Sequence, residues 1–244
     1  MLFFKNKKEK LPDLSWVSTD IHSHLIPGID DGSQDMETSL KMVRGLADLG
    51  YKKFITTPHI LWEVYPNTPE IINNGLIPLN NKVKEENLQV EVHAAAEYFL
   101  DEHFVQLITS GSQLLTISDG MVLIEFSMLT APLDLQEQLF ELQMRNYNPI
   151  IAHPERYSYM NRKREFFDNL KDAGYLFQLN LMSLTGYYGP VVQELAEYLI
   201  KKDYYNFVGT DLHSLKHLAQ LQKLATSDYL KRLKDSGNIK NCNL

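Results

Sequence analysis

The sequence lacks the glycine patterns on which several large enzyme classes depend. It has no G-x-G, which excludes the dinucleotide-binding and kinase glycine loops, and no Gly-Lys pair, which excludes a P-loop. It also has no G-x-S-x-G nucleophile elbow and no D-x-D pair typical of aspartyl-phosphate enzymes. If the chain is an enzyme, its chemistry must be built from other residues.

Cysteine and long apolar runs are scarce as well. The single cysteine, Cys242, cannot form an intrachain disulfide, which is typical of a reducing compartment. No arginine follows it to bind a phosphate, so a cysteine-nucleophile phosphatase is excluded. No segment approaches the roughly 20 apolar residues of a membrane span, and the N-terminus has no signal-peptide core. We therefore expect a cytoplasmic protein that is not an integral membrane protein.

The charge balance argues against nucleic acid as the main partner. The 244 residues carry 24 basic and 31 acidic side chains, a formal net charge of -7, so no uniform field attracts phosphate backbones. Four lysines lie close together near the N-terminus, and we interpret residues 1–14 as a solvated basic tail. We expect one domain over residues 15–244, and the sequence leaves open whether it forms a homo-oligomer.

Short β-branched apolar runs alternate with amphipathic stretches along the chain, which predicts a parallel α/β fold. The expected strands are 17–24, 53–59, 88–100, 121–125, 149–153, 175–181 and 206–211. The expected helices are 36–49, 133–144, 166–173, 191–200 and one from about residue 215, and the Asn-rich segment before residue 88 has weak helical character. Seven strand-helix units favour a closed or nearly closed barrel in one domain, with a doubly wound open sheet as the alternative.

Side chains of metal-ligand type follow almost every expected strand. They are His22, His24, His59, Glu97, Glu125, His153, Asp211 and His213. His22 and His24 are two residues apart, so both imidazoles project to the same side of an extended strand. A single histidine is more often a core or surface residue. Because six strand ends carry such residues, coincidence is a poor explanation.

The ligand set is too rich for one ion, because a catalytic zinc needs about three protein ligands. Either Asp30 or Asp31 in the first loop is expected to join it, giving a site for two or three ions. Imidazole and carboxylate ligands without thiolate suit manganese, iron or zinc. Three divalent ions against four carboxylates would leave a net charge of about +2, which matches a phosphate monoester dianion.

Three further side chains are candidates for substrate binding. Arg156 follows His153 in His-Pro-Glu-Arg and is expected to bind phosphate oxygens, the alternative being a surface salt bridge with Glu155. Trp62 and Tyr65 follow His59 and are candidates to flank a phenyl leaving group, although simple packing explains them equally well.

The motifs in chain order are Asp-Ile-His-Ser-His24, Gly-Ile-Asp-Asp-Gly32, Thr-Pro-His59, Ala-Glu97-Tyr-Phe, Ile-Glu125-Phe-Ser, His153-Pro-Glu-Arg156 and Thr-Asp211-Leu-His213. Together they resemble the polymerase and histidinol phosphatase (PHP) superfamily. Within it, the chain is most similar to the bacterial metal-dependent tyrosine-protein phosphatases of capsule and exopolysaccharide operons. The resemblance covers residues 20–214 and implies a distorted seven-stranded (β/α)7 TIM-like barrel.

The resemblance also implies a trinuclear centre, with manganese as the expected ion and iron or zinc as alternatives. The implied ligands are His22, His24, Glu97 and Asp211 for one metal, Glu97, Glu125 and His153 for a second, and Asp31, His59 and His213 for the third. Arg156 matches the phosphate-contacting arginine of the family. Relatives carry another arginine after the Asp-x-His motif, where this chain has only Lys216 and His217.

The activity implied is hydrolysis of phosphotyrosine by a metal-activated hydroxide, with Asp211 and Arg156 as catalytic residues. The implied substrate is the tyrosine-rich tail of a membrane-associated bacterial tyrosine kinase. A histidinol-phosphate phosphatase would share the metal cluster and is the main alternative. Exonucleolytic editing is opposed by the acidic charge balance, and a binding module without turnover is a further alternative.

Overall fold

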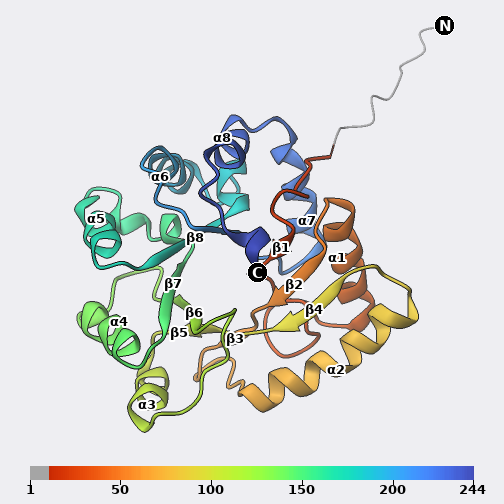
Figure 1. The fold of residues 1–244 in the computed structure, drawn as a ribbon, viewed down its shortest axis with the longest axis horizontal. Helices are drawn as coiled ribbons and strands as arrows, with labels where there is room; N and C mark the ends of the chain where they lie inside the picture. Colours follow the sequence, from red (N-terminus) through yellow and green to blue (C-terminus); the bar gives the residue numbers. More distant parts are fainter. Residues whose placement is uncertain (1–10) are drawn as a thin grey trace, which may run out of the picture.

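The computed structural model describes residues 11–244 as a mixed α/β fold (Figure 1). The lysines of the expected tail fall in residues 1–10 and lie outside the described residues. Leu14, the last residue of that expected solvated tail, is instead fully buried, and its N donates to Leu49 O at 2.8 Å, so the expected boundary at residue 14 was wrong. The strands are β1 (Thr19–Asp20), β2 (Lys53–Thr56), β3 (His59–Ile60), β4 (Glu91–Ala94), β5 (Glu97–Phe99), β6 (Met121–Glu125), β7 (Asn148–Ala152), β8 (Leu176–Asn180) and β9 (Phe207–Gly209). The helices are α1 (Met36–Asp48), α2 (Pro69–Glu85), α3 (Glu102–Ser110), α4 (Leu135–Met144), α5 (Glu165–Asp172), α6 (Pro190–Lys201), α7 (Leu215–Leu221) and α8 (Asp228–Ser236).

All strand pairs are parallel, and the strands form two sheets. One sheet has the order β1-β2-β4 and the other β3-β5-β6-β7-β8-β9. The helices surround the strands instead of covering both faces of one open sheet (Figure 1). The chain is therefore a single α/β domain whose parallel sheet curves into a half-barrel, and the doubly wound alternative is wrong.

The expected strands 53–59 and 88–100 are each divided between the two sheets. Pro58 separates β2 from β3, and it has no N–H with which to continue the ladder. Ala95 and Ala96 separate β4 from β5 opposite this break, and Glu97 N donates to Pro58 O at 3.1 Å. The prediction of one continuous third strand was wrong because the break bends the chain from one sheet into the other.

Hydrogen bonds also join the segments that follow the first and last strands. Asp211 N donates to His22 O at 2.7 Å, and His24 N donates to Leu212 O at 3.0 Å. Ser23 and Leu212 form a parallel bridge between the same segments. Two stretches of chain almost 190 residues apart therefore lie side by side, and each carries candidate ligands.

Helix α2 extends over Pro69–Glu85, although the sequence of this segment predicts only weak helical character. Thr68 caps it by accepting from Ile71 N at 3.3 Å, and Pro69 occupies its first turn. Ile72, Leu79 and Val83 are buried on one side of the helix. Burial of this apolar face stabilises the helix despite its asparagines and an internal proline, because packing outweighs intrinsic propensity.

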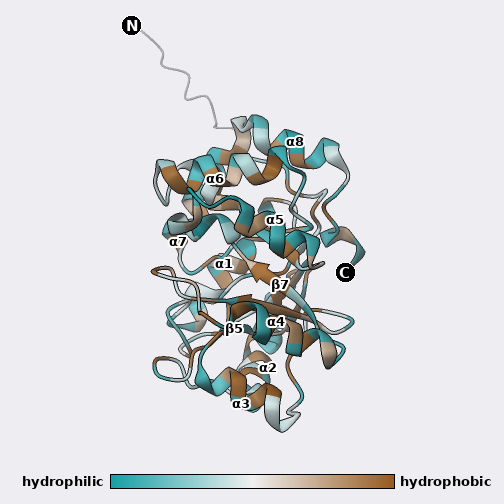
Figure 2. Ribbon diagram, turned by 90° about the vertical axis from the view of Figure 1, so that its left-hand side faces the viewer, coloured by the Kyte–Doolittle hydropathy of each residue, from teal (hydrophilic) through white to brown (hydrophobic). Residues whose placement is uncertain are grey.

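The apolar core lies on both sides of the strands, and the strands are its most hydrophobic part (Figure 2). A small inner cluster includes Ile55, Leu123 and Ile150 from neighbouring strands. Leu123 and Glu125 are two residues apart on β6, so Leu123 packs in the inner cluster while Glu125 faces the cavity at the strand end. Within residues 11–244, no helix is long and apolar enough to cross a membrane.

Candidate active site

The carboxyl ends of the strands surround one cavity of about 610 Å³. The predicted ligands that line it are Asp31, His59, Glu97, Glu125, His153, Asp211 and His213. His22 and His24 are fully buried against these residues. The structure thus brings all nine predicted metal ligands together from segments spread over the whole domain.

Glu97 occupies the centre of this cluster and is itself buried. Its Oε2 lies 3.2 Å from His22 Nε2, 3.5 Å from His24 Nε2 and 3.0 Å from His59 Nδ1. Its Oε1 lies 3.2 Å from His153 Nε2. One carboxylate therefore faces four imidazoles, an arrangement suited to bridging cations.

Asp211 divides its two oxygens between different partners. Its Oδ1 lies 3.4 Å from His22 Nε2 and 3.6 Å from His24 Nε2. Its Oδ2 accepts from Arg156 Nη1 at 3.0 Å and from Asn180 Nδ2 at 2.7 Å. The same side chain therefore faces the imidazole cluster and holds the predicted phosphate-binding arginine in place.

Two of the ligand positions have backbone conformations that are rare outside glycine. His153 has a φ of 31° and Asp211 a φ of 49°, both in the left-handed region. Such conformations cost on the order of 1–3 kcal/mol and tend to occur at functional sites. Here they turn the chain sharply at the ends of β7 and β9, where both side chains join the cluster.

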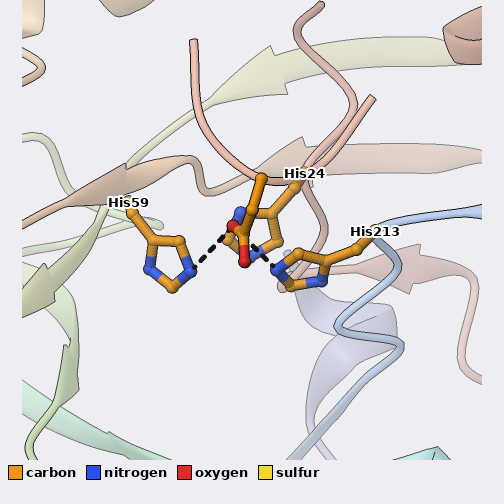
Figure 3. A group of neighbouring side chains, drawn as sticks. His24, His59 and His213 are labelled. Carbon is orange, nitrogen blue, oxygen red and sulfur yellow. Dashed lines mark ion pairs between the residues drawn. The ribbon is translucent and has the colours of Figure 1, made fainter. Parts of the chain in front are cut away.

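A second group of side chains gathers around Asp31 (Figure 3). Its Oδ1 lies 3.5 Å from His59 Nε2 and 3.4 Å from His213 Nε2, and His24 lies beside them. Asp30 does not face the cluster in this way, because its Oδ2 accepts from His24 Nδ1 at 2.7 Å and from His59 N at 3.1 Å. The sequence did not decide which of the two aspartates faces the cluster, and in the structure it is Asp31.

Hydrogen bonds on the outer side of the imidazoles determine which nitrogen faces the cluster. His22 Nδ1 bonds to Gln178 Oε1 at 2.8 Å, and His24 Nδ1 bonds to Asp30. His213 Nδ1 bonds to a main-chain carbonyl at 2.9 Å. These partners accept, so each Nδ1 carries a hydrogen and each Nε2 faces the cluster, where it can ligate a metal once any proton on it is released.

The buried polar atoms of the cluster fit a bound cation. His22 Nε2, His24 Nε2, His59 Nδ1 and Glu97 Oε2 are buried without a hydrogen bond among the described residues. Leaving such atoms unpaired is costly, and a divalent ion would satisfy several at once. The ligand atoms form four overlapping groups within 4.8 Å, namely His24-Asp31-His59-His213, His22-His24-Asp211, His22-Glu97-His153 and His59-Glu97-Glu125.

Electrostatics in the cluster also favour added positive charge. Burial opposes protonation of His22, but the charges of Glu97 and Asp211 outweigh it and raise its pKa to about 10. Burial, together with the neighbouring charge of Glu97, raises the pKa of Glu125 to about 8. Without cations, the site therefore holds protons that bound ions would replace.

Arg156 lines the cavity, whereas its neighbour Glu155 does not. Its guanidinium carbon lies 4.6 Å from the centre of the Tyr188 ring, and its side chain is 25% exposed. Glu155 is instead fully buried, where its carboxyl group accepts from Asn180 N at 2.9 Å and from Tyr205 OH at 2.8 Å. The alternative of a surface salt bridge between Arg156 and Glu155 is therefore wrong.

The two predicted aromatic side chains have different surroundings. Tyr65 lines the cavity and lies nearly parallel to the His59 ring, with 5.6 Å between centres. Trp62 stacks on His103 at 3.9 Å, is 41% exposed and does not line the cavity. The structure thus brings Tyr65, but not Trp62, to the metal cluster.

The sequence offers Lys216 and His217 at the position where relatives carry a further arginine. His217 lines the cavity, whereas Lys216 lies over the ring of Tyr187, 5.7 Å from its centre. Gln178 and Asn180 alternate on β8, and this polar spacing in a buried strand was the available signal for their inward side chains. The sequence gave no comparable signal for Met128, which also lines the cavity.

Parallel strands whose carboxyl ends carry imidazoles, carboxylates and an arginine define the class of protein, an α/β protein with overlapping candidate metal-binding groups beside an arginine. The chain belongs to the capsular polysaccharide synthesis family CpsB/CapC, whose model matches residues 18–238. This confirms the resemblance predicted from the motifs.

Similar proteins carry a consistent description. The chain is 30% identical over 198 residues to the tyrosine-protein phosphatase YwqE of Bacillus subtilis (strain 168), covering 81% of this chain and 78% of that protein. It is 26% identical over 210 residues to the putative tyrosine-protein phosphatase CapC of Staphylococcus aureus, covering 86% and 82%. The crystal structures of YwqE from B. subtilis and CpsB from Streptococcus pneumoniae are described as those of metal-dependent tyrosine phosphatases. That match has a TM-score of 0.80 at 27% identity and covers 91% of this chain and 89% of the other.

Proposed function

We propose that this chain is a metal-dependent tyrosine-protein phosphatase that hydrolyses phosphotyrosine on a protein substrate. The observation that carries the proposal is the convergence of nine candidate ligands and Arg156 on one cavity. The family membership and the named relatives support the same activity.

The proposed centre holds three divalent ions, with manganese expected and iron or zinc as alternatives. The proposed ligands are His22, His24, Glu97 and Asp211 for the first ion, Glu97, Glu125 and His153 for the second, and Asp31, His59 and His213 for the third. The buried unpaired nitrogens and the overlapping ligand groups support this assignment. When bound, such ions supply Lewis-acid charge and activate water for attack on phosphorus.

Arg156 is proposed to bind the phosphate group and to orient it over the cluster. A guanidinium can contact two phosphate oxygens at once, and Asp211 and Tyr188 fix the side chain at the cavity wall. Asp211 therefore has two tasks, with one oxygen for the metal centre and the other for the arginine. Both residues are catalytic in this proposal.

The finer description of the fold is also a proposal. We count β2 with β3 and β4 with β5 as single interrupted strands, which gives a distorted seven-stranded barrel. The hydrogen bonds between residues 22–24 and 211–212 support closure of the ring. Residues 15–244 would then form one phosphatase domain.

The proposed substrate is the phosphorylated, tyrosine-rich tail of a membrane-associated tyrosine kinase, reached from the cytoplasm. The description of the family as one of capsular polysaccharide synthesis supports a partner in that process. Phosphorylated kinase tail, incubated with the enzyme and probed for phosphotyrosine, should lose its signal. Retention of the signal on the tail, with turnover of other phosphopeptides, would contradict this choice of substrate.

The activity is tested by phosphate release from manganese-loaded protein. We expect release from a phosphotyrosine peptide to exceed release from histidinol phosphate, and Asp211→Asn to abolish it, because the amide removes a ligand charge and the contact with Arg156. Metal-stripped protein serves as the control. Undiminished activity of Asp211→Asn would refute the site, and preference for histidinol phosphate would refute the substrate.

A further inference from the structure

The cavity wall has two chemically different halves. The residues of one half follow β3 and β6, the strands on either side of β5, and are the apolar side chains Leu61, Val64 and Met128 together with Tyr65. The residues of the other half follow β7, β8 and β9, and are Arg156, Tyr188, Ser214 and His217. The candidate metal ligands come from strands of both halves, with Glu97 on β5, Glu125 on β6 and His153 directly after β7.

The apolar half is built on a closed loop over residues 61–65. Leu61 and Tyr65 pair across it, with Tyr65 N donating to Leu61 O at 2.7 Å. Trp62 N donates to Asp101 at the start of α3, and the Trp62 ring stacks on His103. Trp62 therefore anchors the loop, and Val64 is left 57% exposed at the cavity.

The polar half provides the groups that an anion needs. Arg156 is held there by Asp211 and by Tyr188, and the imidazole of His217 lies on the same side. A phosphate bound between Arg156 and the cluster would leave its ester oxygen and leaving group free to point toward the apolar half. Only an apolar leaving group would gain from that orientation, because burial of polar groups there would leave them unpaired.

We infer that this apolar half, defined by Leu61, Val64, Tyr65 and Met128, binds the phenyl ring of the substrate and makes the enzyme selective for aryl phosphates. The inference rests on the proposed phosphatase function and adds Val64 and Met128 as specificity-determining residues. Phosphoserine and histidinol phosphate present a short or cationic group to the same wall. Neither buries the apolar surface that a phenyl ring buries there.

Competitive inhibition of the manganese-loaded enzyme by phosphonates tests the inference. Phenylphosphonate and methylphosphonate share the anion and differ in the ring, so we expect wild-type protein to prefer phenylphosphonate. Met128→Gln and Val64→Asn should each weaken phenylphosphonate binding by roughly 3- to 10-fold and leave methylphosphonate binding unchanged. Met144→Gln and Ile77→Asn change exposed apolar residues on α4 and α2 and serve as matched controls.

The outcomes separate this inference from the proposed function. Equal inhibition of the wild type by both phosphonates, or an unchanged ratio in both cavity variants, would overturn the apolar half as the ring site. Failure of wild-type protein to release phosphate from a phosphotyrosine peptide would instead refute the phosphatase proposal. Loss of binding for both phosphonates in the cavity variants would show damage to the anion site and would also count against a ring-specific role.

Discussion

Hydrogen bonds to the proposed metal ligands orient their side chains toward the site where a metal ion would bind. Asp30 supports two of them, because it accepts from His24 Nδ1 and from His59 N, while its other oxygen accepts from Gly32 N at 2.9 Å. Its pKa falls to about 2, since the charge of His24 and these hydrogen bonds outweigh burial. Of the two aspartates that the sequence offers as a ligand, Asp30 is thus a positioning residue.

We expect Asp30→Asn to weaken manganese binding about 10- to 100-fold, as other changes behind metal-ligating histidines do. The amide removes the charge and replaces one accepting oxygen with a donor, so His24 and His59 lose their common support. Calorimetric titration with manganese measures the effect. Asp48→Asn, at an exposed position on α1, is the matched control, and equal affinity in both variants would contradict the role of Asp30.

Protons in the cluster make metal binding depend on pH. Burial opposes protonation of His59, but the charge of Glu97 prevails and raises its pKa to about 10, like that of His22. Both imidazoles are therefore protonated at neutral pH without metal and must release protons when ions bind. We expect manganese affinity to rise about tenfold or more per unit between pH 6 and 8, with protons released in calorimetry across buffers. An affinity that is flat over this range would contradict the coupling.

Eight of the nine candidate ligands were predictable from the sequence because each stands at the end of an apolar run, whereas the first loop left open whether Asp30 or Asp31 joins them. In parallel α/β folds the carboxyl ends of the strands meet at one edge of the sheet. An alternating pattern of strands and helices is therefore enough to predict that these side chains lie together. The supporting contacts were only partly predictable. The polar spacing on β8 indicates the inward side chain of Gln178, but Tyr188 and Met128 come from separate loops, and only the packed structure shows that both reach the cavity.

At the scale of elements, strand interruptions and helix caps determine boundaries that hydrophobic patterns alone do not predict. The apolar runs predicted the strands, but the bend that divides them between two sheets depends on Pro58 and on pairing with distant partners. Helix α2 likewise depends on burial of one face. Local propensity describes these segments poorly because their stability comes from tertiary packing.

Asp101 joins one helix cap to the loop of the apolar half. Its Oδ1 accepts from Phe104 N at 2.8 Å as the cap of α3, and its Oδ2 accepts from Trp62 N at 3.0 Å. We expect Asp101→Ala to cost about 1–2 kcal/mol in the free energy of unfolding. It should also raise KM for a phosphotyrosine peptide, because the loop loses its anchor.

Urea unfolding and steady-state kinetics measure the two effects. Ser227→Ala removes the cap of α8, where Ser227 Oγ accepts from Leu230 N at 3.2 Å, and should lower stability without changing KM. Asp101→Asn should retain most of the cap and lose the contact with Trp62 N. A KM that rises equally in the Ser227 variant would show that the effect follows stability and not the loop.

At the scale of the whole molecule, the proposed metal centre links segments that are distant in the sequence. The candidate ligands from His22 to His213 span most of the domain, and several buried imidazoles and the Glu97 carboxylate have atoms without a hydrogen-bond partner within residues 11–244. Ions that bind only the folded chain stabilise it by mass action, about 4 kcal/mol at a thousandfold excess over Kd. For a domain of this size, that corresponds to a shift of roughly 8–16 °C in Tm.

We therefore expect chelation to lower Tm by several degrees at least and manganese to restore it, as measured by circular dichroism during thermal unfolding. Asp211→Asn should lose most of the manganese-dependent gain, because it removes a charge shared by the imidazole cluster and Arg156. Met144→Gln, at an exposed position far along α4, should keep the full gain. A Tm that does not respond to chelation in wild-type protein known to contain metal would mean that the centre forms without stabilising the fold.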